Sequence, residues 1–182
     1  MRAKPYPACS RGQQHLDAAL RLRRSETFDL DDIEIIESDQ QHFSLLRPAA
    51  ADEDAAGFSA AYHISAALVF GSFGVDQITT KALQDPRVRA LMKRFKHVPF
   101  SEANKVTVRL KDGRVLSDDI LPYRNLENLG DLEPKFRQCA GRVLGDSELE
   151  ELRDLILGLE MQPNIERIMA IAGTECPAAA KI

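Results

Sequence analysis

The feature that most constrains the fold is a run of alternating residues that reaches a turn and starts again. Lys105-Val-Thr-Val-Arg-Leu110 alternates between polar and apolar side chains, and Lys111-Asp112-Gly113 has the composition of a tight turn. Arg114-Val115-Leu116 then begins a second extended run. Two extended runs joined by an Asp-Gly turn predict a β-hairpin. This part of the chain therefore indicates a small antiparallel sheet.

A third strand and several helices are predicted before the hairpin. The segment from Ile33 to Ser38 carries a nearly alternating apolar face and predicts a strand. Leu16, Ala19 and Leu20 recur at helical spacing, which predicts a helix over residues 13–24. Further helices are expected over 58–70, 75–83 and 85–95, and a loop over 49–56.

Two of these helices have well-marked ends. The helix from Phe58 to Phe70 has one narrow, mostly apolar face whose small residues would let another element pack closely, and Gly71 is expected to end it. Asp85 and Pro86 are residue types favoured at the N-cap and first position of a helix, which should then run through Phe95.

The C-terminal part of the chain has a purely helical pattern. Helices are expected over 131–142, 146–160 and 164–173. The whole pattern predicts an α+β fold: a domain over residues 1–122 with a small antiparallel sheet and helices, a helical segment over 131–173, and a frayed tail over 174–182. Three short helices cannot build a core alone, so they should dock on the sheet or on a missing helical domain.

Composition narrows the functional classes. The 182 residues are 44% hydrophobic, which is enough for a real core, and the net charge of −4 argues against nucleic-acid binding. No signal peptide or membrane-spanning run is found, and three widely separated cysteines fit a reduced compartment. We therefore expect a cytoplasmic protein with no membrane or nucleic-acid partner.

The N-terminal segment Lys4-Pro-Tyr-Pro-Ala-Cys9 has the composition of a rigid site loop. Proline fixes its own φ and keeps the preceding residue out of the helical region, so Lys4 and Tyr6 should lie on stiff, extended backbone. Such a loop can aim the lysine side chain, although Lys4 could also be an ordinary exposed lysine. Only three residues precede it, which suggests that the chain carries part of a site.

Metal-dependent or cysteine-based catalysis is not indicated. His42, His63 and His97 show no metal-ligand spacing and the cysteines do not approach them, so no metal and no cofactor are expected. Cys9 follows the rigid loop, but without a neighbouring histidine it is better interpreted as a small packed thiol.

Several segments, taken in order, resemble the C-terminal part of the MmgE/PrpD family over residues 4–172. The resemblance is carried by the order and spacing of these segments. They are Lys4-Pro-Tyr-Pro through Asp17-Ala-Ala-Leu20, Asp32-Ile-Glu-Ile-Ile36, Phe58-Ser-Ala-Ala-Tyr62 through Ala66-Ala-Leu68, Gly74-Val-Asp-Gln77, Asp85-Pro-Arg-Val-Arg-Ala-Leu91, Val106-Thr-Val-Arg-Leu-Lys-Asp-Gly113 and Lys135-Phe136.

The resemblance implies both a domain plan and a reaction. The family includes 2-methylcitrate dehydratase, cis-aconitate decarboxylase and iminodisuccinate epimerase. It implies a lid domain over residues 1–122 and helices over 131–173 that return to a larger helical domain, absent here. The implied chemistry is general acid–base addition or loss of water on small di- and tricarboxylates. Only half of the pocket would then lie in this chain.

Two residues are implied as catalytic. Lys4 stands at the family's lysine position and is suited to clamp a carboxylate or to stabilise an enolate-like centre. Tyr62 stands at the family's tyrosine position, where a phenol can donate to a substrate oxygen. The alternative for Tyr62 is packing on a helix face with its hydroxyl at the surface.

Two further residues, Ser59 and Gln13, are implied to bind the substrate. Many members have Thr-His where this chain has Gly12-Gln13, and glutamine can hydrogen-bond a carboxylate but cannot act as an acid or base. His15 lies on a different helical face and is expected at the helix surface.

Two hypotheses follow. The chain is the C-terminal portion of an MmgE/PrpD-type lyase, a homo-oligomer or homodimer that works with a helical domain or subunit. Alternatively, it is a non-catalytic interaction module that pairs with a helical subunit or with itself. Both predict exposed apolar surface on 131–173 and on the Phe58–Phe70 face.

Overall fold

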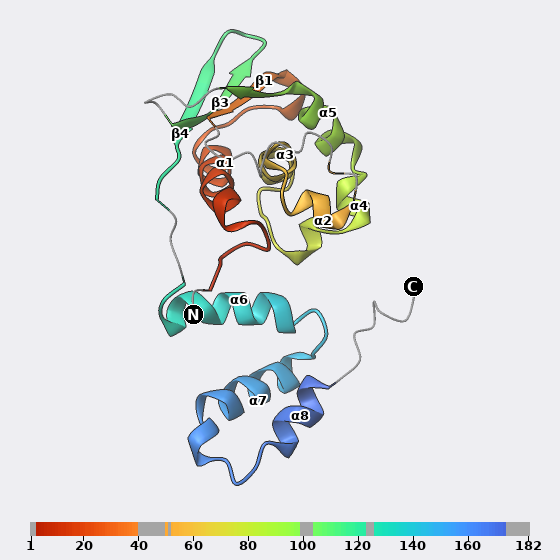
Figure 1. The fold of residues 1–182 in the computed structure, drawn as a ribbon, viewed down its shortest axis with the longest axis vertical. Coiled ribbons are helices and arrows are strands. Elements are labelled where there is room, and N and C mark those ends of the chain that lie inside the picture. The colour runs from red at the N-terminus through yellow and green to blue at the C-terminus, as the bar shows by residue number, and fades with distance from the viewer. Residues whose placement is uncertain (1–2, 40–49, 51, 99–103, 123–125, 174–182) are drawn as a thin grey trace. The chain divides into compact units, whose positions relative to one another are not determined.

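The computed structural model describes residues 3–39, 50, 52–98, 104–122 and 126–173. These residues form two compact units, one ending at residue 122 and the other beginning at Leu126 (Figure 1). The first unit combines a sheet with helices and the second is helical, which confirms the predicted α+β class.

The first unit contains short helices between and beside its strands. Its α-helices are α1 (Gln13–Ser25), α2 (Glu53–Ala56), α3 (Ala60–Phe70), α4 (Thr80–Leu83) and α5 (Pro86–Arg94), and its 3-10 turns cover Ser10–Gly12, Leu30–Asp32 and Val75–Gln77. Its strands are β1 (Ile33–Asp39), β2 (Phe95–Val98), β3 (Lys105–Leu110) and β4 (Val115–Asp119).

Among the described residues the sheet has four strands in the order β2-β1-β3-β4. The predicted hairpin is confirmed, with Val108 opposite Leu116 across β3 and β4, and β1 runs antiparallel to β3. β2 instead runs parallel to β1, with Ile36 opposite Phe95, so the sheet is mixed and not wholly antiparallel. The helix predicted through Phe95 ends at Arg94, because the following residues pair with β1.

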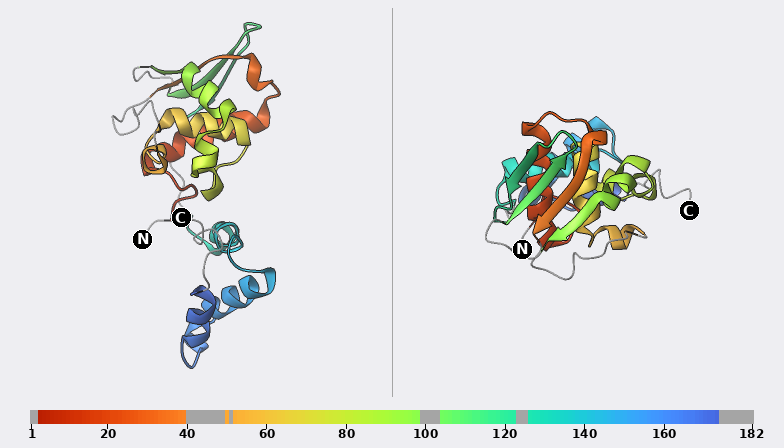
Figure 2. Two further views of the ribbon diagram at one scale, coloured as in Figure 1. Left: turned by 90° about the vertical axis from the view of Figure 1, so that its right-hand side faces the viewer. Right: turned by 90° about the horizontal axis from the view of Figure 1, so that it is seen from above.

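Helix α3 lies at the centre of this unit. Figure 1 shows it end-on among α1, α2, α4 and α5, and Figure 2 shows the sheet covering one side of the helices. All residues from Ala60 to Leu68 are buried. The prediction of one apolar face left exposed is therefore wrong for this helix. Small side chains such as Ala66 and Ala67 let neighbours approach it from every direction.

Local capping explains the boundaries of two helices. Gly71 ends α3 with φ of 66°, in the left-handed region that glycine adopts without strain. Residues 53–56, expected in a loop, form α2 because the Asp52 side chain accepts a hydrogen bond from the Ala55 N–H at 2.7 Å.

The second unit consists of α6 (Leu129–Ala140), α7 (Asp146–Leu157), a 3-10 turn (Leu159–Met161) and α8 (Glu166–Ala172). Contrary to expectation, these helices form a small core of their own. It contains four buried side chains, and ion pairs such as Arg167 with Glu151 join α8 to α7 at the surface. The buried side chains are Leu144, Leu149, Leu152 and Ile171.

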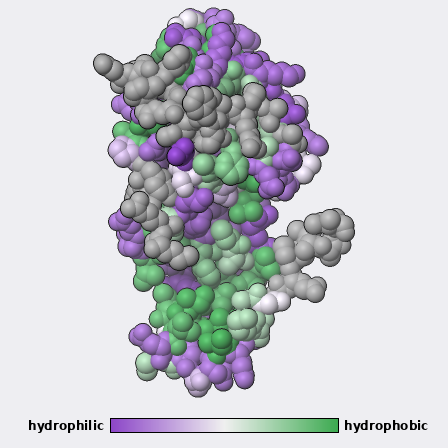
Figure 3. Space-filling model, viewed as in Figure 1, coloured by the Kyte–Doolittle hydropathy of each residue, from purple (hydrophilic) through white to green (hydrophobic). Residues whose placement is uncertain are grey.

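The second unit also exposes many apolar side chains, as predicted. Figure 3 shows hydrophobic residues gathered on the surface of these helices. Met161 is 81% exposed, and no residue of α6 is buried. The large exposed side chains of this unit are Leu129, Leu132, Ile156, Leu157, Leu159, Met161, Ile165 and Met169.

Candidate functional site

The N-terminal loop carries Lys4 on backbone that is tied to the rest of the first unit. Lys4 is exposed, and its Nζ donates a hydrogen bond to the Ala8 carbonyl at 3.0 Å. The Cys9 N–H donates to the Gly57 carbonyl at 2.9 Å, which fixes the end of the loop against the turn before α3. The lysine thus lies on a segment held by hydrogen bonds, but residues 5–8 bend and do not run extended as expected, because the Ala8 N–H donates to the Tyr6 carbonyl at 2.9 Å.

Gln13, the first residue of α1, lies fully buried beneath this loop. Its Oε1 accepts a hydrogen bond from the Tyr6 N–H at 3.0 Å. Its Nε2 donates to the Tyr6 carbonyl at 3.0 Å and to the Ala8 carbonyl at 2.8 Å. One side chain therefore holds the backbone of the loop at two residues.

Tyr6 is a second anchor that the sequence interpretation did not single out as a site residue. Its hydroxyl donates to Asp17 Oδ1 at 2.5 Å. Burial raises the pKa of Tyr6, and the hydrogen bond to Asp17 and that residue's charge raise it further. Helical spacing places Asp17 on the same face of α1 as Gln13, but it does not show that either residue contacts Tyr6.

Ser59 and Tyr62 lie at the start of α3. The Ser59 Oγ accepts a hydrogen bond from the Tyr62 N–H at 3.2 Å and so caps the helix. The Tyr62 ring is buried, and its hydroxyl donates to the Gln77 carbonyl. Burial raises the pKa of Tyr62, and the charges of Asp85 and Glu53 add to the shift.

The four predicted site residues therefore fall into two groups. Lys4 and Gln13 meet at the Ala8 carbonyl, which accepts a hydrogen bond from each. Ser59 and Tyr62 share the first turn of α3. The contact between Cys9 and Gly57 links the loop to the segment that leads into α3.

Comparison with known proteins identifies the family. The family model of the MmgE/PrpD C-terminal domain matches residues 6–161. The chain belongs to the MmgE/PrpD family. Lys4 lies two residues before the matched range, and the other three predicted site residues lie inside it.

One curated relative is a cis-aconitate decarboxylase-like protein, oryM, of Aspergillus oryzae. It is 24% identical to this MmgE/PrpD domain over 128 residues, which cover 64% of this chain. The match covers 27% of the relative, so the chain spans about a quarter of the length of that protein.

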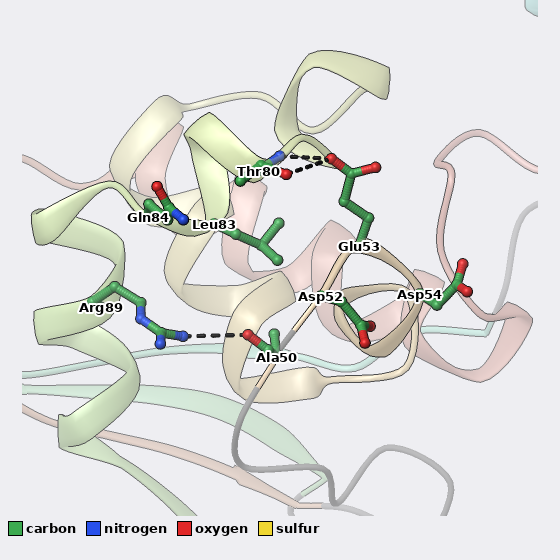
Figure 4. A pocket seen from close by; sticks show the side chains of 8 residues that line it. All are labelled: Ala50, Asp52, Glu53, Asp54, Thr80, Leu83, Gln84 and Arg89. Carbon is green, nitrogen blue, oxygen red and sulfur yellow. Dashed lines mark hydrogen bonds between the residues drawn. The ribbon is translucent and has the colours of Figure 1, made fainter. Parts of the chain in front are cut away.

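A large hollow on the MmgE/PrpD domain does not contain the predicted site residues. It has a volume of about 550 Å³ and is drawn in Figure 4. Arg89 donates to the Ala50 carbonyl at its edge, and Glu53 accepts two hydrogen bonds from Thr80. Three carboxylates line it, so its charge disfavours an anionic substrate. The lining residues are Ala50, Asp52, Glu53, Asp54, Thr80, Leu83, Gln84 and Arg89.

Two histidines of the domain are buried, and the prediction of a surface position for His15 is wrong. Its Nδ1 lies 3.0 Å from Ser38 Oγ, between α1 and β1. His63 on α3 is fully buried, and its ring packs edge-on against Phe73. Burial lowers the pKa of His63 to about 4, opposed in part by the carbonyls of Ala56 and Gly57. Neutral imidazole is therefore the folded form at neutral pH.

Two kinds of site are absent from the described residues, a metal cluster and a membrane-spanning helix. Across the described ranges, no three His, Cys, Asp or Glu side chains are grouped as a metal ion would require. Within those ranges, every helix is too short or too polar to cross a bilayer.

Proposed function

We propose that this domain supplies one side of the active site of a lyase that adds or removes water on a small di- or tricarboxylate. The observation that carries the proposal is the anchored loop, which presents the Lys4 ammonium from backbone held by buried Gln13. Family membership supports it, and the relative's name refers to cis-aconitate, a small tricarboxylate.

The proposed step is an acid–base elimination. A base removes a proton from the carbon beside a carboxylate, the C–H electron pair becomes the new C=C bond, and the neighbouring hydroxyl leaves as water after receiving a proton. Lys4 stabilises the negative charge that develops on the carboxylate. Tyr62 donates the proton, since its raised pKa keeps it protonated. It must exchange its Gln77 acceptor to do so.

Two further parts complete the proposed site. Ser59, beside Tyr62 at the start of α3, binds the substrate, as the family resemblance predicts. The base comes from a helical domain outside the described residues. In the reverse direction the same groups add water to the double bond.

An apolar groove on the second unit supports the idea of a helical partner. It has a volume of about 220 Å³, and its polar rim holds Glu133 and Arg153 joined by an ion pair. An apolar groove of this kind is suited to the apolar face of another helix. Its apolar lining consists of Leu129, Leu132, Phe136, Ile156 and Leu157.

The same groove favours a second candidate function, a non-catalytic module that binds a helical subunit or another copy of itself. The two candidates differ in turnover. The interaction module binds its partner without chemistry, whereas the lyase converts substrate once the helical domain is present.

The deciding experiment measures turnover of 2-methylcitrate and cis-aconitate by NMR, with this chain alone and with an MmgE/PrpD helical domain supplied as a separate chain. We expect turnover only with both. Lys4→Ala should reduce it by roughly 100-fold or more, the effect of losing one charge-stabilising group.

The matched control is Lys111→Ala, which alters an exposed lysine in the turn between β3 and β4. It should leave the rate unchanged. Turnover by this chain alone would contradict the shared site, and binding of the helical domain without turnover would favour the interaction module.

A further inference from the structure

We propose that Gln13 and Asp17 are positioning residues that fix the Lys4 loop onto α1, and that Gln13 does not itself contact substrate. The role of Lys4 in this inference rests on the function proposed above. The attachment of the Lys4 loop to α1 by Gln13 and Asp17, called the clamp below, does not rest on that function, because it is defined by contacts within the chain.

The hydrogen-bonding capacity of Gln13 argues against a direct role in substrate binding. A glutamine amide has two N–H donors, and a carboxylate can only accept. Both donors of Gln13 are used, one by the Tyr6 carbonyl and one by the Ala8 carbonyl. Gln13 is also fully buried. To bind a carboxylate it would have to break one of these bonds in a buried site, which is costly.

The Ala8 carbonyl connects Gln13 to the lysine. It accepts from Gln13 Nε2 at 2.8 Å and from Lys4 Nζ at 3.0 Å. The buried amide therefore fixes the position of the oxygen that holds the exposed ammonium. Loss of the Gln13 side chain should free this carbonyl and with it the side chain of Lys4.

Asp17 supplies the second point of attachment. It lies four residues after Gln13, so both side chains lie on the same face of α1. Gln13 holds the backbone of Tyr6 and Asp17 holds its hydroxyl. Because prolines at 5 and 7 restrict the backbone on both sides of Tyr6, fixing this one residue orients the whole loop.

The first test is amide hydrogen exchange in the full chain with Gln13→Ala. The Tyr6 N–H loses its acceptor, so we expect its exchange to rise roughly tenfold, the usual scale for one hydrogen bond. The Cys9 N–H should also exchange faster. Amides of β3, such as Val108, should exchange as before. Gln14→Ala, at the neighbouring half-buried glutamine, is the matched control and should change none of them.

The second test is ultraviolet titration of the tyrosines in Asp17→Asn. Removal of the carboxylate charge should lower the pKa of Tyr6 towards its ordinary value, while burial keeps part of the shift. This variant also decides the question if Gln13→Ala does not fold. Unchanged exchange at Tyr6 in a folded Gln13→Ala chain, or an unchanged Tyr6 titration in Asp17→Asn, would overturn the clamp.

A kinetic readout in the reconstituted enzyme separates positioning from substrate contact. Positioning predicts that Gln13→Ala lowers kcat with little change in KM, whereas a direct contact predicts a raised KM. A raised KM with unchanged kcat would overturn the inference. If loop exchange rises while Lys4→Ala has no effect on turnover, the clamp is supported and the proposed function fails.

Discussion

Helices α3 and α6 differ in how much of their surface is buried within their own unit. Every residue of α3 from Ala60 to Leu68 is buried within its own unit, whereas α6 buries none of its residues. The first helix is apolar on all sides and rich in small residues, so neighbours enclose it. The second has a polar side and an apolar side that its own unit covers only in part, through residues such as Phe136. The distribution of apolar residues around a helix thus indicates how much of its surface must be buried against other elements.

The two units also differ in where their polar groups lie. The α+β unit buries His63 with neither ring nitrogen in a well-formed hydrogen bond. The helical unit has no histidine, and its charges pair at the surface, as between Arg137 and Glu150. The two units should therefore differ in their response to core truncation, acid and salt.

The largest expected effect is truncation of the α3 core. Ile64→Ala removes a fully buried side chain and should lower the free energy of unfolding of the α+β unit by about 2–5 kcal/mol. Leu157→Ala in the helical unit removes a side chain that is 48% exposed and should change stability by less than about 0.5 kcal/mol. Thermal unfolding followed by circular dichroism measures both. Equal losses of stability in the two variants would contradict the difference in burial between the two helical regions.

The next effect is acid sensitivity that arises in the α+β unit. The pKa of His63 is about 4 when folded and near 6.5 when unfolded, so the unfolded state binds the proton more readily. The contribution of His63 to the free energy of unfolding is therefore fully present above pH 6.5 and is lost as pH falls to about 4. The loss is about 3 kcal/mol, from 1.36 kcal/mol per pKa unit.

His63→Leu isolates this contribution, because it keeps an apolar side chain of similar size without a titrating group. The variant should lose less stability than the parent chain between pH 6.5 and pH 4 in denaturant titrations. Parallel loss in the two chains would show that burial of His63 does not set the acid response.

The smallest effect concerns the surface ion pairs of the helical unit. Glu133 accepts hydrogen bonds from Arg137 and Arg153, and these contacts lower its pKa. Glu133 therefore contributes to the stability of the folded unit at pH values above its pKa in the unfolded chain. This contribution is lost as the pH falls through its lower pKa in the folded chain. Glu133→Gln should lower the melting temperature of α6–α8 slightly at low salt.

High salt should remove the difference between Glu133→Gln and the parent chain, because screening weakens exposed ion pairs. Glu160→Gln changes an exposed carboxylate in the same unit and serves as the control. If both variants behave alike at low salt, the ion pairs do not stabilise these helices.

Features set by neighbouring residues were predictable from the sequence. The β3–β4 hairpin forms around Gly113, whose φ of 89° suits the Asp-Gly turn. Asp85 and Pro86 begin α5 as expected, because an N-cap side chain and a proline act within one helical turn.

Features set by distant residues were not predictable in this way. The parallel pairing of β2 with β1 joins Phe95 to Ile36 across the chain, and four residues carry too short a pattern to reveal it. His15 is polar, so its burial beside Ser38 could not be inferred from helical periodicity alone.

The candidate site shows the same limit. The sequence by itself determined the family and the presence of an α+β unit followed by helices, because these depend on residue type and order. Only the tertiary structure decided that the Gln13 amide faces the loop and that α3 is enclosed on all sides. Both outcomes depend on which side chains meet after folding, and hydrogen-bond partners far apart in sequence leave no local pattern.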